Sequence, residues 1–342
     1  MKAAVVEKPG KLVVQDIPLP EMGDYDVLCE MLYGATCSGT DLHIIHNRFP
    51  WGVQYPTVLG HESIGRATKV GRKVRHFKVG DLITRVGTRP VPGFQVNWGG
   101  FAEFGLARDH QAMKADGLPP AEWDGYRVNQ VLPPGTDPAA ATMTITWRET
   151  LSYVTRLGIG AGAHVLVVGS GGNGLAIAAH ARNLGAASVA MVGSENRRKA
   201  AAAVGIKLYL DYRNDAVPAT LAKERPEGFD FIVDAVGKEG QLDRVIGALK
   251  SGGALSIYGI DEFGACSIHP QRARGPFRFF PAMYDEEEAH GRVVAFMRDG
   301  KLDARVWLDL DHVYPLEQIA DAFKAVEARQ VIKAVVKLSA GK

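Results

Sequence analysis

Cysteine is scarce in this chain, and so are long apolar runs and any excess of one charge. Cys29, Cys37 and Cys266 are too few and too scattered in 342 residues for a disulfide framework, so reduced thiols are expected. The first apolar run is four residues long, too short for a signal peptide or a membrane span. Because 40 basic and 38 acidic residues nearly balance, no electrostatic footprint for nucleic acid or a membrane arises. These absences predict a cytoplasmic protein without nucleic-acid or membrane partners.

The length is sufficient for two domains, each with its own core. The first hundred residues alternate short β-branched runs with Gly and Pro, which is typical of strands joined by turns. From about Gly162, strand-length apolar runs alternate with Ala-rich stretches of helical spacing. This pattern predicts an α/β fold with a doubly wound parallel sheet. The terminal run IKAVVKL is expected to return as a strand to the first domain.

A glycine-rich motif follows the first strand of the alternating region. In VLVVGSGGNGLAIAAHARNLGA, Gly169, Gly171 and Gly174 have the G-x-G-x-x-G spacing between an apolar strand and an Ala-rich helix. Gly169 permits a tight turn, Gly171 lets the backbone approach a pyrophosphate, and Gly174 lets the helix pack close to the strand. Together with Gly172 in the same loop, they predict a dinucleotide site.

The end of the next strand indicates which dinucleotide binds. NAD-binding proteins place an Asp or Glu there, whereas SVAMVGSENRR ends in Gly193 and Ser194. Arg197 and Arg198 follow, and a guanidinium group supplies donors for a 2′-phosphate. We therefore expect NADP to be preferred over NAD, with the charge of Glu195 directed away from the phosphate. The alternative is that both arginines only occupy the first turn of a helix.

These motifs resemble the medium-chain dehydrogenase/reductase superfamily, specifically its zinc-type alcohol and polyol dehydrogenase branch. The resemblance extends over essentially the whole chain. It rests on seven segments in the family's order: TDLH (40–43), GHE (60–62), VGD (79–81), GGFAEF (99–104), VLVVGSGGNG (165–174), FDFIVDAVG (229–237) and IKAVVKL (332–338).

The resemblance implies a discontinuous, β-rich, chaperonin-10-like catalytic domain from residues 1–147 and 278–342. A dinucleotide-binding (Rossmann) domain, residues 148–277, is inserted between them, with a small-molecule substrate in the interdomain cleft. A homodimer or homotetramer is also implied. In the NADP-dependent branch, a Gly-Ser-Arg and a later Tyr hold the 2′-phosphate. Gly193, Ser194 and Tyr212 match, but Glu195 occupies the Arg position, so Arg197 or Arg198 would have to substitute.

Zinc-dependent family members hold the metal with the Cys of a Cys-x-Ser/Thr-Asp motif, the His of Gly-His-Glu, and a Cys, Asp or Glu near the nucleotide domain. His61 and Glu62 match the second motif here. Zinc in such a site polarises the alcohol or carbonyl oxygen of the substrate. Counting back from Asp41, however, the first ligand position falls on Ser38, and Cys37 comes one residue too early.

The displaced cysteine leaves two interpretations open. In an extended segment a one-residue shift reverses the face, so Cys37 would point away from His61 unless a bulge absorbs the extra residue. The third ligand position falls on Ile145, which cannot bind metal, and Glu149, one helical turn further on, is a candidate replacement. Cys37, His61 and Glu62 are the candidate ligands of a single catalytic zinc. The alternative is a metal-free site in which Cys37 is a buried apolar residue.

The resemblance also implies a proton relay. Thr40 and His43 match the positions at which a hydroxyl passes the substrate proton, through the ribose, to a histidine at the surface. The structural zinc of many family members needs four closely spaced cysteines after Gly-His-Glu. Residues 85–101 contain none, so no structural zinc is expected.

The sequence therefore predicts an NADP-dependent oxidoreductase that moves a hydride between nicotinamide and a small alcohol, polyol, sugar or carbonyl compound. Two alternatives remain. In a zinc-independent NADPH-dependent reductase of a carbonyl or activated double bond, Ser38, Thr40 and His61 would donate hydrogen bonds to the substrate oxygen. The other alternative is an NADP(H)-binding protein without catalysis. Four aromatic residues are candidates for a pocket wall or for core packing: Trp51, Phe94, Trp98 and Trp147.

Overall fold

The computed structural model describes residues 1–262, 267–281 and 283–339, so Cys266 lies outside the described residues. The chain divides into two compact units. The first comprises Met1–Ile145, His290–Arg298 and Asp303–Lys342, and the second comprises Thr146–Ala289 and Asp299–Leu302. In the described part of the chain, no helix is long and apolar enough to cross a membrane.

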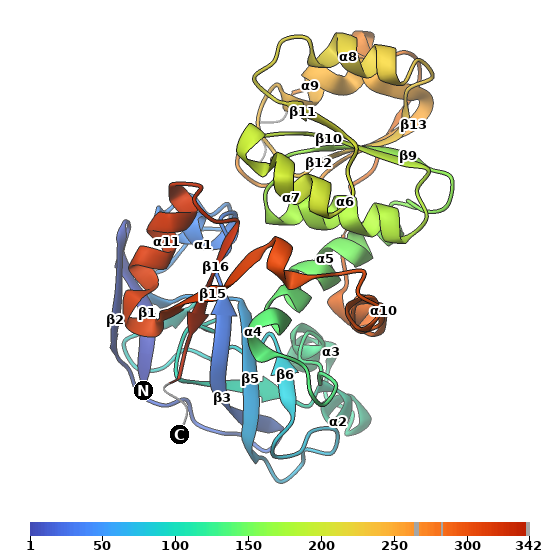
Figure 1. Ribbon diagram of the computed structural model, residues 1–342. Helices are drawn as coiled ribbons and strands as arrows, with labels where there is room; N and C mark the ends of the chain where they lie inside the picture. Colours follow the sequence, from blue (N-terminus) through green and yellow to red (C-terminus); the bar gives the residue numbers. More distant parts are fainter. Residues whose placement is uncertain (263–266, 282, 340–342) are drawn as a thin grey trace. The chain divides into compact units, whose positions relative to one another are not determined.

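The first unit is built on two β-sheets (Figure 1). One has the order β2 (Lys11–Asp16), β1 (Lys2–Lys8), β4 (Thr57–Val58), β7 (Gln95–Val96). The other has the order β15 (Leu308–Pro315), β16 (Lys333–Lys337), β3 (Asp26–Ala35), β5 (Glu62–Val70), β6 (Leu82–Thr84), and β8 (Phe104–Arg108) also pairs with β3. The predicted return of the C-terminal strand is confirmed, because β16 pairs antiparallel with β3 and sets Val335 opposite Ala35.

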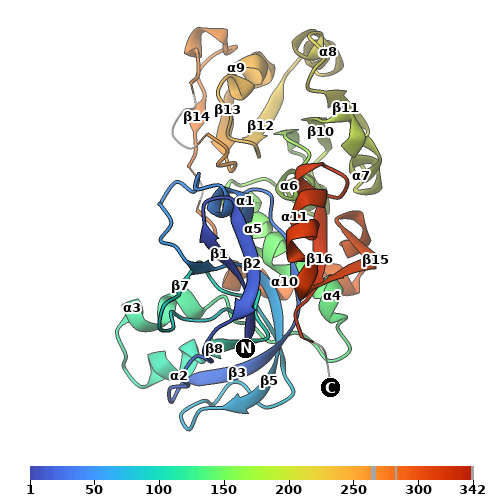
Figure 2. The same ribbon diagram turned by 90° about the vertical axis from the view of Figure 1, so that its left-hand side faces the viewer.

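Short helices surround these sheets: α1 (Thr40–Ile45), α2 (His110–Ala115), α3 (Pro120–Trp123), α4 (Pro138–Ala141) and α11 (Ile319–Glu327). In α11, Ile319, Phe323 and Val326 recur at helical spacing and are buried in the core of this unit. Figure 2 shows α11 beside β16, with which it is in contact. The helix thereby covers the sheet that carries the end of the chain.

The second unit is a six-stranded parallel sheet. Its order is β11 (Leu208–Asp211), β10 (Ser188–Gly193), β9 (His164–Val168), β12 (Phe229–Asp234), β13 (Leu249–Ile257), β14 (Arg278–Phe279). In Figure 1, α6 (Gly172–Asn183) and α7 (Arg198–Ala203) lie on one face, and α8 (Val217–Glu224) and α9 (Gln241–Val245) lie on the other. This doubly wound order, with the first strand central, is that of dinucleotide-binding folds. The predicted α/β class is confirmed.

The second boundary between the units lies twelve residues beyond the one that the sequence suggests. Residues 278–289 belong to the second unit because β14 extends its sheet and because the start of α10 (Glu286–Arg298) bonds to α5 (Met143–Arg156). Arg148 of α5 donates to Glu286 at 2.6 Å, and both side chains are buried. Arg156 forms a bidentate pair with Glu288 at 2.7 and 2.9 Å. These ion pairs hold the segment against the parallel sheet domain.

Candidate functional site

The glycine loop of the second unit has the geometry that a dinucleotide needs. Gly169 has φ +102°, a left-handed conformation that favours glycine. A Cβ on Gly174 would lie 2.0 Å from the carbonyl oxygen of Gly169, so only glycine lets α6 pack this closely. A Cβ on Gly171 would meet no atom within 4 Å, and Gly172 begins α6 beside that open space. The N-terminus of a twelve-residue helix therefore faces room for a phosphate group.

The end of β10 presents polar groups beside this loop. The backbone N–H of Ser194 donates to the Ser170 hydroxyl at 3.0 Å, and Tyr209 donates to the Ser194 carbonyl at 2.6 Å. A Cβ on Gly193 would collide with the Ser170 and Tyr209 hydroxyl oxygens, at 2.2 and 2.5 Å. Gly193 is thus fixed by close packing, and Ser194 is held by its neighbours.

The charge of Glu195 is balanced by Arg198. The guanidinium group donates to both carboxylate oxygens, at 2.6 and 2.8 Å, on the exposed surface. Arg198 also lies over the Tyr209 ring, with its Cζ 5.0 Å from the ring centroid. The pair keeps the pKa of Glu195 below its ordinary value, chiefly through the hydrogen bond from Arg198. Arg197 lies in the 3₁₀ turn Glu195–Arg197, and its N–H donates to the Ser194 carbonyl at 2.8 Å.

Tyr212 contacts the end of β10 through its backbone. Its backbone N–H donates to the Gly193 carbonyl at 2.9 Å, while its half-buried ring packs against the core of the second unit. The phenol that contacts Ser194 belongs to Tyr209, which sequence reasoning missed. The available signal was the position of Tyr209 within β11, the strand that pairs with β10.

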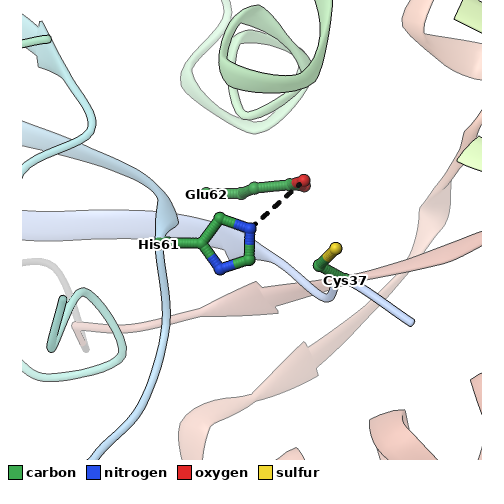
Figure 3. A group of neighbouring side chains, drawn as sticks. All are labelled: Cys37, His61 and Glu62. Carbon is green, nitrogen blue, oxygen red and sulfur yellow. Dashed lines mark ion pairs between the residues drawn. The ribbon is translucent and has the colours of Figure 1, made fainter. Parts of the chain in front are cut away.

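In the first unit, Cys37, His61 and Glu62 come together (Figure 3). One ligand atom from each, all buried, lies within 4.8 Å of the others. Donor atoms around a tetrahedral zinc ion are about 3.5 Å apart, as follows from metal–ligand distances of about 2.0 to 2.3 Å. Small side-chain adjustments would bring these three atoms onto one ion. They are the candidate metal centre among the described residues.

Local structure explains why the offset of Cys37 does not remove it from the cluster. The segment before α1 is a turn and not an extended strand, so the face-reversal argument is wrong here. The N–H of Asp41 donates to the Cys37 carbonyl at 3.1 Å, and the N–H of Cys37 donates to the Asp41 carboxylate at 2.9 Å. The N–H of Thr40 approaches the Cys37 sulfur at 3.5 Å. This closed turn accommodates the extra residue and directs the sulfur toward His61.

His61 is oriented by its neighbours. Gly60 before it has φ +104°, and a Cβ there would lie 2.7 Å from the backbone nitrogen of Phe101. The Nδ1 atom of His61 is 3.1 Å from the Asp41 carboxylate, which leaves Nε2 toward Glu62 at 3.8 Å. Burial disfavours the imidazolium form, but Asp41 and the Cys37 sulfur outweigh it and raise the pKa of His61 well above its ordinary value. Such a site attracts a cation, and a carboxylate on Nδ1 is the usual support of a metal-bound histidine.

Glu62 has a second partner, Lys333 of β16. Both carboxylate oxygens lie 2.6 Å from the ammonium nitrogen. Burial would lower the pKa of Lys333, but the charges of Glu62, Cys37 and Asp41 outweigh it and raise that pKa. The cluster therefore includes a fixed cation that sequence motifs did not reveal.

The two positions considered for the third ligand lie in different units. Ile145 is fully buried among apolar residues of the first unit, including Ile64 and Leu132. Glu149 belongs to the second unit, where its carboxylate accepts from the Tyr258 hydroxyl at 3.3 Å.

The predicted relay residues lie close to the cluster in sequence but differ in exposure. Thr40 is half-buried at the start of α1. His43 is buried and not a surface residue, and its Nδ1 is bonded to the Gly39 carbonyl. Ser38 is exposed.

The four aromatic candidates separate into two groups. Trp147 is fully buried in the second unit, and Phe94 packs in a small apolar core with Val96. Trp98 lies beside the cluster, with its ring centroid 5.3 Å from that of His61. Trp51 is exposed and belongs to the same aromatic group as Trp98 through Phe49.

Comparisons with known proteins agree with this architecture. The family described as "Alcohol dehydrogenase GroES-like domain" matches residues 23–118, and "Zinc-binding dehydrogenase" matches residues 172–286. L-threonine 3-dehydrogenase of Streptomyces avermitilis is 32% identical over 282 residues, covering 76% of this chain and 77% of that protein. D-arabinitol dehydrogenase 1 of Uromyces fabae is 26% identical over 352 residues, covering 98% and 97%. The alcohol dehydrogenase TADH from Thermus sp. ATN1 shares the fold, with a TM-score of 0.80 at 20% identity over 98% of this chain and 99% of that one.

A GroES-like domain that carries a Cys-His-Glu cluster, joined in one chain to a doubly wound nucleotide domain, defines a nicotinamide-dependent dehydrogenase. The predicted family is confirmed: the chain belongs to the medium-chain dehydrogenase/reductase superfamily, in its zinc-type alcohol and polyol dehydrogenase branch. It is an oxidoreductase that transfers a hydride between an alcohol or polyol and a nicotinamide cofactor.

Proposed function

We propose that this enzyme is a zinc-dependent, NADP-preferring dehydrogenase of small alcohols or polyols and the matching carbonyl compounds. The observation that carries the proposal is the convergence of Cys37, His61 and Glu62. The Asp41 carboxylate orients His61 through its contact with Nδ1. A thiolate, an imidazole and a carboxylate are a donor set that suits zinc in a site with one open position.

The residues present fit the metal. Zinc bound there would act as a Lewis acid on the substrate oxygen. Cys37 and His61 would hold the ion, Glu62 would supply the third donor, and Lys333 would balance the negative charge of the cluster. Hydride transfer then requires the nicotinamide carried by the second unit to meet a substrate held at this cluster.

A proton must also leave the alcohol. We propose that the Thr40 hydroxyl accepts this proton as it gives up its own, which passes through the ribose of the cofactor to His43. The bond between His43 Nδ1 and the Gly39 carbonyl supports this role, because it fixes the orientation of the imidazole ring close to Thr40 in the sequence.

The preference for NADP rests on the end of β10. Gly193 and Ser194 place no carboxylate at the position where NAD-binding proteins bond the ribose. Arg198 neutralises the charge of Glu195, and its guanidinium group also lies over the ring of Tyr209, whose hydroxyl contacts Ser194. These groups are suited to a 2′-phosphate.

A homodimer or homotetramer is part of the proposal. The edge strand β14 exposes Phe279, and Phe280 and Met283 follow it with exposed side chains. An exposed apolar sheet edge supports pairing with a second copy. Light scattering after gel filtration would give the mass of the assembly.

The metal assignment is tested by elemental analysis of protein purified without chelators or metal-affinity resin. We expect about one zinc per chain, lost in Cys37→Ser and in His61→Ala. Cys29→Ser is the matched control, because Cys29 is also a buried thiol of the first unit but lies outside the cluster. If the parent protein contains no zinc but reduces carbonyl compounds, it is the zinc-independent reductase. The ion pair between Glu62 and Lys333 favours this second candidate, because it already balances the charge of the carboxylate.

The cofactor assignment is tested by kcat/KM with NADP and NAD. We expect NADP to be favoured and Arg198→Ala to reduce that preference at least tenfold, which is about 1.4 kcal/mol of binding. Arg72→Ala is the control, since this exposed arginine pairs with Asp24 in the first unit. An unchanged ratio in Arg198→Ala would exclude its role in phosphate binding.

A further inference from the structure

An aromatic series leads from the surface to the metal-binding cluster. The ring centroids of Trp51 and Phe49 are 5.0 Å apart, those of Phe49 and Trp98 are 6.1 Å apart, and those of Trp98 and His61 are 5.3 Å apart. Exposure falls along the series, from 68% at Trp51 and 38% at Trp98 to 4% at His61. Large aromatic side chains left exposed next to a buried reactive cluster indicate a ligand surface.

The backbone fixes the position of Trp98. Its φ is +63°, a left-handed conformation that is uncommon for a bulky residue. The N–H of Thr88 donates to the Trp98 carbonyl at 2.8 Å, and a Cβ on Gly87 would lie 2.2 Å from that same oxygen. Strain of this kind persists where the surroundings enforce it, and it concentrates at ligand sites. The indole is therefore held beside His61 by the chain and not by packing of the ring alone.

The rings of Trp98, Phe49 and Trp51, called here the aromatic wall, favour the binding of ligands with flat apolar groups. Indole and phenyl rings gain about 0.5 to 1.5 kcal/mol from stacked or edge contacts with another ring, beyond the burial of area. An open-chain polyol instead carries a hydroxyl on each carbon, and each needs a hydrogen-bond partner once it is desolvated. Arg85 makes a cation–π contact with Trp98, since its guanidinium carbon lies 6.0 Å from the centroid of the indole ring.

We propose that Trp98, with Phe49 and Trp51 beside it, is the specificity-determining surface, and that the substrate carries an aromatic or conjugated ring next to the reacting carbon. This inference rests on the proposed function, because the reacting oxygen must be held at the cluster. Aryl-substituted primary alcohols and their aldehydes are the class that fits. Open-chain polyols, which appear in the names of two relatives, D-arabinitol dehydrogenase 1 and sorbitol dehydrogenase, would gain less from aromatic contacts.

The test compares benzyl alcohol, 1-propanol and sorbitol as substrates of the parent enzyme and of Trp98→Gly. Glycine removes the indole and also adopts the left-handed conformation without strain. We expect benzyl alcohol to have the highest kcat/KM in the parent, and the ratio of kcat/KM for benzyl alcohol to that for 1-propanol to fall about tenfold in Trp98→Gly, through a higher KM for benzyl alcohol. Trp98→Phe should restore most of the KM. Trp123→Ala is the control, an aromatic of the first unit that packs with Leu118 away from the wall.

A binding measurement tests the proposed aromatic recognition separately from the proposed dehydrogenase activity. Benzamide carries the ring and an oxygen but cannot donate a hydride, and its binding is measured by saturation-transfer NMR on the intact protein. Binding in the parent that is lost in Trp98→Gly supports the wall even if no alcohol is oxidised, an outcome that would reject the proposed function alone. Preference for sorbitol with the same benzamide signal in both proteins overturns the wall and leaves the dehydrogenase intact.

Discussion

The ammonium nitrogen of Lys333 lies 2.6 Å from both carboxylate oxygens of Glu62, and the two side chains are 3% and 1% exposed. This buried pair ties the last strand of the first unit to the metal-binding cluster. Water cannot screen it, so each charge depends on the other.

Replacing Lys333 alone should therefore destabilise the enzyme strongly. We expect Lys333→Met to lower the free energy of unfolding by about 3 to 5 kcal/mol, because it removes the ammonium group that bonds to both oxygens of a buried carboxylate. The double variant Lys333→Met/Glu62→Gln should recover most of this loss. Urea unfolding with a chelator present measures all three proteins. Lys324→Met, which breaks an exposed pair with Asp321, should cost less than about 1 kcal/mol, and an equal effect at both lysines would contradict the argument.

Asp41 should control metal affinity without contacting the metal. We expect Asp41→Asn to weaken zinc binding about 10- to 100-fold, because the amide orients and polarises His61 less well than a carboxylate. Competition with a chromophoric chelator gives the affinity. Asp109→Asn changes a buried carboxylate of the same unit outside the cluster and should leave zinc affinity unchanged.

The stability contributed by Asp109 should depend on pH. Burial raises the pKa of this carboxyl, but hydrogen bonds from the N–H groups of Arg75, Ala112 and His76 outweigh burial and lower it. A folded-state pKa below the unfolded one gives stability that is complete above about pH 4 and is lost as the pH falls further. Asp109→Asn should cost about 1 to 2 kcal/mol at pH 7. The difference between the unfolding curves of parent and variant should shrink as the pH falls below about 4, and a constant difference would exclude the charge as the cause.

The thiol of Cys29 should not react with alkylating reagents in the folded protein. Burial raises the pKa of its thiol to about 12, so the reactive thiolate is almost absent at pH 8. Iodoacetamide followed by peptide mass spectrometry should find Cys29 unmodified in native protein and modified in urea. Labelling of the native protein at the rate of a free thiol would show that β3 opens locally.

The features that could be predicted from the sequence are those set by neighbouring residues. The glycine loop and the apolar strand before it predicted the nucleotide fold, because Gly169 and Gly174 meet within six residues. Cys37 could not be placed in this way. Its direction depends on a turn that the Asp41 side chain closes, and an offset counted along an extended strand does not describe a turn.

Contacts between distant segments were out of reach for the same reason. No motif near Glu62 in the sequence indicates Lys333, and the hydrogen bond from the Tyr209 side chain to the Ser194 carbonyl joins residues fifteen positions apart. Family spacing selected Tyr212, whose backbone N–H bonds to Gly193, whereas the phenol that reaches the Ser194 carbonyl is that of Tyr209.

The separation of Glu62 and Lys333 by 271 residues also has a consequence for biosynthesis. During translation, Glu62 leaves the ribosome long before Lys333 is synthesised. The whole second unit is translated between these two residues. The first unit therefore cannot bury its cluster during translation and must finish folding after the last strand emerges. A nascent chain halted before residue 333 would keep this carboxylate in water, open to chaperones and to adventitious metal ions.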